Sequence, residues 1–202
     1  MISLLHHDRA TVDRVVDFHG GLCPALALGI QAARIALEEV GINGRDHEVH
    51  ADCEDDSCGV DAVQALTGCT LGNRDLRILP YGKFAFTFHR RSDGKTVRIA
   101  ARPEAWAWDP EHLGLFARVQ AGLASPTQLE RFGKMHRQRA ESILQASPRD
   151  LLSVGYLGVT PPPRPYSPRP SVACSQCGEL VESHHIEDVD GAPFCRPCAQ
   201  TR

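Results

Sequence analysis

Four cysteines near the end of the chain have the spacing of metal ligands. They form two C-x-x-C pairs, Cys174 with Cys177 and Cys195 with Cys198. A C-x-x-C turn brings two thiolates within reach of one tetrahedral ion, and Gly178 suits the tight turn after the first pair. Because about thirty residues cannot fold on an apolar core alone, bound metal must supply most of their stability. The spacing therefore predicts one structural zinc ion held by all four cysteines.

The order of these residues also indicates the kind of module around the ion. A cysteine turn, a hairpin and then cysteines at the start of a terminal helix resemble a treble-clef or zinc-ribbon finger. A redox role is disfavoured, because no thioredoxin-like strand–helix–strand pattern surrounds the pairs. Nucleic-acid binding would need a basic face, and this segment is acidic; His184 and His185 are expected at its surface. Its acidic residues are Glu179, Glu182, Glu187, Asp188 and Asp190.

A second group of residues capable of chemistry lies near the start of the chain. His19 precedes Cys23 by four residues across a glycine turn, and Pro24 then opens a helix that Cys23 can cap. The N–H groups and the dipole at a helix start favour a thiolate over a thiol. This pair therefore suits metal ligation or nucleophilic catalysis. Simple packing is the alternative, since cysteine is among the most buried residue types.

Three further cysteines follow in the first third of the chain. Cys58 and Asp61 come just after an acidic run at residues 54–56, and Cys69 follows the next predicted helix. A cation would be stabilised near these carboxylates, although an acidic run is also typical of a solvated loop. Cys53 lies on a predicted strand and is expected in the core.

The elements that must position these residues are of mixed type. Apolar spacing predicts helices over residues 11–18, 24–40, 60–67 and 129–146, and strands over residues 48–53, 83–89 and 96–101. The turn residues Ser92-Asp93-Gly94 predict a hairpin between the last two strands. This mixture favours an α+β fold with antiparallel pairing.

Composition sets the domain organisation and excludes several classes of function. The proline-rich segment 161–172 cannot form a helix or an interior strand, so it is expected to be a spacer between a domain at 1–160 and a finger at 173–202. The net charge of −3 provides no chain-wide attraction to nucleic acid or to anionic membranes. No apolar stretch is long enough for a membrane span, and the first residues lack a signal-peptide core. A cytoplasmic location is expected.

Taken together, the N-terminal motifs resemble the FmdE family, which is named for a component of molybdenum and tungsten formylmethanofuran dehydrogenases. The resemblance covers about residues 10–155, and residues 118–150 look like the helical end of the family. Some members carry a C-terminal zinc finger. The chain departs from the family at Gly21, where a second histidine is common, and at Asn73, where a lysine is common. The matching motifs are Phe18-His19-Gly20, Leu22-Cys23-Pro24, Ala27-Leu28-Gly29, Cys58, Asp61-Ala62, Gln64, Leu66-Thr67-Gly68-Cys69-Thr70, Gly72 and Tyr81-Gly82-Lys83.

This resemblance implies a fold, an assembly and a site. The fold would be α+β with a mixed sheet, similar to the C-terminal domain of glyceraldehyde-3-phosphate dehydrogenase (GAPDH), and the protein would be a homodimer. A second transition-metal ion, with zinc as one candidate, would lie in a cleft of the N-terminal domain. Candidate catalytic residues are Cys23 and Lys83. The candidate ligands are His19, Cys23, Cys58 and Cys69, and the candidate substrate-binding residues are Asp61, Thr70 and Lys83.

Three functions are compatible with this sequence. The first is a metal-binding accessory protein for a molybdenum or tungsten oxidoreductase, acting in delivery, sensing or assembly, with the acidic finger docking a partner. The second is a metal- or thiolate-dependent enzyme acting on a small anionic one-carbon or acyl substrate. The third is a structural or interaction protein in which the cysteine and histidine group is core packing.

Overall fold

A computed structural model describes residues 9–159 and 169–201 of the chain. The chain divides into two compact units, residues 1–165 and residues 166–202. The predicted spacer at 161–172 falls mostly outside the described residues, and its last two residues, Ser171 and Val172, belong to a strand of the second unit.

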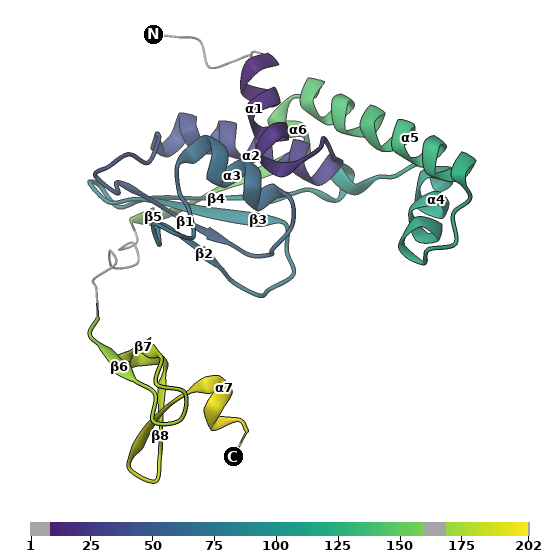
Figure 1. Ribbon diagram of the computed structural model, residues 1–202. Coiled ribbons are helices and arrows are strands. Elements are labelled where there is room, and N and C mark those ends of the chain that lie inside the picture. The colour runs from purple at the N-terminus through teal and green to yellow at the C-terminus, as the bar shows by residue number, and fades with distance from the viewer. Residues whose placement is uncertain (1–8, 160–168, 202) are drawn as a thin grey trace. The chain divides into compact units, whose positions relative to one another are not determined.

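The first unit is built on a mixed five-stranded sheet with helices packed on one face (Figure 1). The strand order is β2-β1-β3-β4-β5, in which β1 and β2 are parallel and the other neighbours are antiparallel. This arrangement confirms the predicted α+β class with a mixed sheet. The strands are β1 (Val49–Cys53), β2 (Leu76–Ile78), β3 (Ala85–Arg90), β4 (Lys95–Ala101) and β5 (Leu152–Val159).

The helices on this face enclose one long central helix, α2, which is buried along most of its length. It packs against the sheet, α3 and α5. The buried side-chain amide of Gln31 in α2 donates hydrogen bonds to the carbonyls of Ile143, Leu144 and Ala146 at 2.7, 3.2 and 3.1 Å, which ties the end of α5 to α2. The helices are α1 (Arg9–His19), α2 (Pro24–Val40), α3 (Gly59–Thr67), α4 (Pro110–Gln120), α5 (Pro126–Gln145) and α6 (Pro148–Leu151), with a short 3-10 helix at Pro103–Trp106.

Two glycines allow α3 to begin directly against α2. A Cβ atom at Gly29 would lie 2.5 Å from the Cα of Gly59, and a Cβ atom at Gly59 would lie 2.6 Å from the ring of Phe84. These separations are shorter than van der Waals contact, so both positions require glycine for this packing. The residues that precede the two helices, Cys23 and Cys58, are positioned by this approach.

Helices α4 and α5 form a hairpin held by a cluster of rings. Trp108, His112 and Phe116 pack with Phe132 and His136, and the ring centroids of Phe132 and His136 are 4.7 Å apart. Nε2 of His112 lies 3.1 Å from Nδ1 of His136. Burial lowers the pKa of both imidazoles, which keeps the pair neutral.

The sequence located most elements but missed some. The helix predicted over residues 129–146, with its entry expected at Ser125-Pro126, runs from Pro126 to Gln145, and Ser125 and Gln128 form a capping box at its start. The predicted hairpin connects β3 and β4 as expected. The short parallel strand β2, the edge strand β5 and helix α4 were not predicted.

The second unit contains two small hairpins and a short terminal helix. Phe194 is buried there with Cys174 and Cys195, and few other side chains join this core. Among the described residues, no helix combines the length and the apolar character that a membrane crossing requires. The elements are β6 (Ser171–Ala173), β7 (Leu180–Glu182), β8 (Ile186–Val189), β9 (Ala192–Cys195), a 3-10 helix at Ser183–His185 and α7 (Arg196–Ala199).

The contact between α2 and α3 gives a first prediction. Gly29→Ala should lower the free energy of unfolding by about 1–3 kcal/mol, because the added methyl group forces the two helices apart. Gly133→Ala in α5 is the matched control: its Cβ would meet open space, so alanine should raise stability by up to about 1 kcal/mol. Urea unfolding followed by circular dichroism measures both. Equal effects of the two substitutions would contradict the packing argument.

Candidate metal sites

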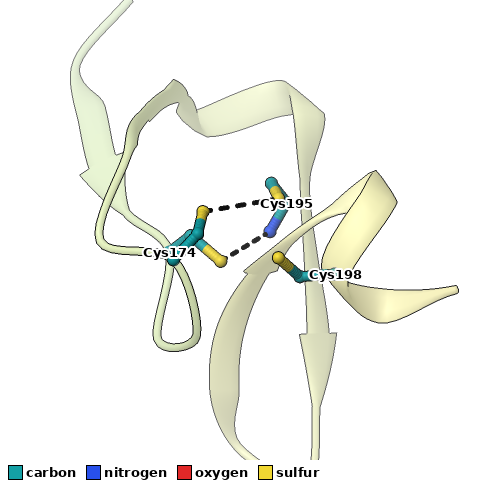
Figure 2. Close-up of side chains that lie close together, drawn as sticks. Cys174, Cys195 and Cys198 are labelled. Atoms are coloured by element: carbon teal, nitrogen blue, oxygen red, sulfur yellow. Dashed lines mark hydrogen bonds between the residues drawn. The ribbon is translucent and has the colours of Figure 1, made fainter. Parts of the chain in front are cut away.

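The four cysteines of the second unit converge on one point. One Sγ atom from each of Cys174, Cys177, Cys195 and Cys198 lies within 4.8 Å of all the others. Figure 2 shows Cys174, Cys195 and Cys198 pointing toward one another. Sulfur ligands about 2.3 Å from a tetrahedral zinc ion are about 3.8 Å apart, and the Sγ atoms of Cys177 and Cys195 are 3.9 Å apart. The group therefore fits a zinc finger of the predicted kind.

Backbone N–H donors lower the pKa of these thiols, whereas neighbouring sulfurs raise it. Backbone N–H groups of Cys177 and Cys195 lower the pKa of Cys174 to about 6, and the N–H of Cys195 donates to its Sγ at 3.3 Å. The side chain of Cys195, together with burial, raises the pKa of Cys198 to about 12. Four adjacent thiolates repel one another, so a bound cation is needed to hold all four in the ionised form.

A second group forms in the first unit, where His19, Cys23 and Cys58 each offer a ligand atom within 4.8 Å of the other two. Each residue stands at a helix end: His19 is the last residue of α1, Cys23 precedes α2 and Cys58 precedes α3. All three are partly buried. Cys23 caps α2 as predicted, and its Sγ accepts the N–H of Leu26 at 3.3 Å.

The imidazole of His19 is oriented toward the two thiols by a carboxylate. Its Nδ1 lies 2.7 Å from Oδ2 of Asp61, and its Nε2 lies 4.0 Å from Sγ of Cys23. With Asp61 as the acceptor, Nδ1 carries the proton and the lone pair of Nε2 faces the sulfurs. A nitrogen and a sulfur on one tetrahedral zinc ion are about 3.5 Å apart, so a small side-chain adjustment would accommodate the ion.

The electrostatics at Cys58 also favour a cation. Burial, followed by the adjacent Cys23, raises the pKa of Cys58 to about 11. A metal ion compensates both effects, because it replaces the lost hydration of the thiolate and neutralises its neighbour. Three protein ligands would leave one position of a tetrahedral ion open to water or to another ligand.

The structure does not bring the other candidate residues into this group. Cys69 lies beyond the far end of α3, about 15 Å along the helix from Cys58 at 1.5 Å per residue. It is fully buried, and its thiol donates to the carbonyl of Val49 at 3.5 Å. Thr70 follows it, and its hydroxyl accepts the N–H of Asn73 at 3.1 Å.

The two charged candidates have different positions. Lys83 is exposed in the loop before β3, where its N–H donates to the carbonyl of Glu54. Asp61, a candidate substrate-binding residue, lies beside the group as the hydrogen-bond partner of His19. Sequence reasoning missed this pairing, although the spacing carried a signal: Asp61 follows Cys58 by three residues, which places both on one face of the start of α3.

Comparison with known proteins relates these sites to a family. Residues 18–153 match the family model described as FmdE, molybdenum formylmethanofuran dehydrogenase operon. A protein of Archaeoglobus fulgidus named as a probable S-adenosyl-L-methionine-binding protein is 32% identical over 197 residues, which cover 92% of this chain. This chain spans 51% of that curated relative, about half its length.

A solved structure extends the likeness to three dimensions. The crystal structure of a tungsten formylmethanofuran dehydrogenase FmdE-like protein from Syntrophus aciditrophicus has a TM-score of 0.62 and 26% identity to this chain. The match covers 94% of this chain and 90% of that one. The family match over most of the first unit and the four-cysteine group of the second lead to one conclusion: the chain belongs to the FmdE family and carries a C-terminal group of cysteines that fits a zinc finger.

Proposed function

We propose that this chain is a metal-binding accessory protein that holds a transition-metal ion at His19, Cys23 and Cys58 and a structural zinc ion in the finger. The observation that carries the proposal is the convergence of one imidazole and two thiols from three helix ends. The hydrogen bond from His19 to Asp61 supports it, because metal-binding histidines commonly donate their other ring N–H to a carboxylate. Zinc is the first candidate for the N-terminal ion, since it favours nitrogen and sulfur ligands in tetrahedral sites.

The position of the site supports a role in handling metal rather than in holding the fold together. The three ligands are partly exposed on a unit that has its own apolar core, and an open coordination position would admit an exogenous ligand. Delivery, sensing and assembly all need such a site. We infer that the partner is a molybdenum or tungsten oxidoreductase of the kind named in the family description.

The finger supplies a second element of this proposal. Leu180 is 76% exposed and stands among acidic side chains, including Glu179 and Glu182. We infer that Leu180 and its acidic neighbours are the part of the finger that contacts the partner. In this proposal the finger docks the partner, the protein works as a homodimer in the cytoplasm, and neither nucleic acid nor membrane takes part.

Binding of S-adenosylmethionine is a second candidate function. The relative from Archaeoglobus fulgidus that is named for this ligand is 32% identical over 92% of this chain, although the chain spans only half of it. The amino and carboxylate groups of the ligand are donors that an open transition-metal position can accept. This candidate therefore uses the same site as the first.

The metal content of the full chain tests the main proposal. The wild-type protein, reconstituted with zinc and dialysed, should retain two ions per chain, one for each group. The double variant His19→Ala, Cys23→Ser should retain one ion, and Cys198→Ser should lose the other. Cys69→Ser is the matched control and should retain both, because its thiol lies outside the group. A wild-type value of one, unchanged in the double variant, would rule out the N-terminal site.

The carboxylate partner of His19 gives a finer test. Asp61→Asn should weaken metal binding at the N-terminal site by about 10–100-fold without changing the number of ions, because the imidazole loses its orienting acceptor. Competition with a chromophoric chelator measures the affinity. Asp56→Asn, an exposed acid nearby, is the control and should leave affinity within about twofold of wild type. If both variants lose metal affinity to the same extent, the loss of one negative charge near the site, and not the orientation of His19, explains the effect.

Calorimetry separates the second candidate from the first. S-adenosylmethionine should bind the zinc-loaded chain with one site, and Cys23→Ser should weaken that binding at least tenfold. Adenosine, which lacks the methionine part, is the control ligand and should not bind at the same concentrations. Binding of adenosine with the same affinity would show that the metal site does not recognise the ligand.

A further inference from the structure

Cys23 and Cys58 are neighbouring thiols that come from different helix starts. Their Sγ atoms lie within 4.8 Å of each other, and both residues are partly exposed. The other two thiols of the first unit, Cys53 and Cys69, are fully buried. Within the described part of this unit, an oxidant dissolved in water therefore reaches only the pair at the candidate metal site.

We propose that Cys23 and Cys58 form a disulfide when peroxide oxidises the metal-free site. A disulfide removes both sulfur ligands, so oxidation and metal binding exclude each other at this position. The competition with metal binding rests on the proposed function, whereas formation of the disulfide needs only the two thiols. The pair is thus a modification site whose co-reactant is a peroxide.

The chemistry proceeds in two balanced steps. The sulfur of Cys23 attacks one peroxide oxygen, the O–O bond breaks, and the products are a sulfenic acid and water. The sulfur of Cys58 then attacks the sulfenic sulfur, the S–S bond forms, the S–O bond breaks and a second water leaves. Two thiols lose two electrons and two protons in total, and one hydrogen peroxide is reduced to two waters.

The contacts of the two thiols assign this order. Sγ of Cys23 accepts the N–H of Leu26 at 3.3 Å at the start of α2, and this contact stabilises negative charge on that sulfur. Cys58 makes no capping hydrogen bond at the start of α3. Cys23 is therefore the residue that peroxide oxidises, and Cys58 is the resolving thiol.

The local backbone permits the bond to close. A disulfide requires the two sulfurs to approach to about 2.05 Å. The turn before Cys23 contains Gly20 and Gly21, and a Cβ atom at either position would meet nothing within 4 Å. This turn has room to move while the packing of α2 against α3 holds the two helix starts together.

Peptide mapping of the full chain tests the proposal. The protein is stripped of metal, treated with hydrogen peroxide, alkylated and digested after lysine and arginine and before aspartate. This digestion places Cys23 and Cys58 in separate peptides, residues 17–34 and 56–60, and keeps them apart from Cys53 and Cys69. The expected product is the linked pair of peptides, two hydrogens lighter than their sum, which dithiothreitol separates.

Two variants test the order in which the thiols react, and pretreatment with zinc tests the competition with metal binding. Cys58→Ser should leave a sulfenic acid on Cys23 that dimedone traps, whereas Cys23→Ser should leave Cys58 largely unmodified. Zinc loaded before peroxide should lower the yield of the linked pair at least tenfold. Absence of the linked pair in wild-type protein, or its replacement by links to other cysteines, would overturn this inference. If the linked pair forms with the same yield whether or not zinc is bound, the proposed disulfide stands and the proposed metal site is wrong.

Discussion

The close packing of α2 against α3 is the constraint on which the N-terminal site depends. Gly29 lacks the side chain that would separate the two helices, and Gly59 lacks the one that would meet the ring of Phe84, so the residues before each helix meet. The turn after α1, with φ of +94° at Gly20, then brings the end of that helix to the same place. The start of α2 directs the N–H of Leu26 at Cys23, which suits a sulfur atom that carries negative charge when it binds a metal. A contact between backbones thus determines where chemistry is possible.

The two metal groups differ in what an ion contributes. The second unit has a core of Phe194 and a few neighbours, so the free energy of binding zinc there is largely free energy of folding. The first unit has a large apolar core around α2 and the sheet, and Cys23 and Cys58 pack against a second apolar cluster formed by α1, α2 and α3. Packing alone positions the ligands of the proposed site, so we infer that an ion leaves it without unfolding the unit. The proposed accessory role needs reversible loading, and the N-terminal group is the one we propose for it.

The sequence predicted best where the ligands are local. Two C-x-x-C pairs define the finger because each pair is a single turn, and the fold class followed from alternating helical and strand patterns. Cys58 and Cys69 could not be separated in this way, since only the length of α3 puts one at the site and the other about 15 Å away. The burial of Gln31 could not be predicted either. Its amide is buried because it donates to the last carbonyls of α5, and no sequence pattern in α2 indicates that partner. Helix α4 had a signal in Asp109-Pro110, an N-cap followed by proline, that could have been used.

Burial divides the thiols of the first unit into two chemical classes. Cys53 and Cys69 are enclosed by the core, and burial raises the pKa of both thiols, to about 11 for Cys69. Neither a metal ion nor a dissolved oxidant reaches the sulfurs of Cys53 and Cys69, and this enclosure keeps both thiols inert. Cys23 and Cys58 are half-exposed and adjacent, which are the properties that metal ligation and disulfide formation share. A site open enough to exchange an ion is therefore also open to oxidants, and a bound ion protects the thiols because it occupies both sulfurs. Any metal-handling role for this chain must consequently depend on the redox state of its surroundings.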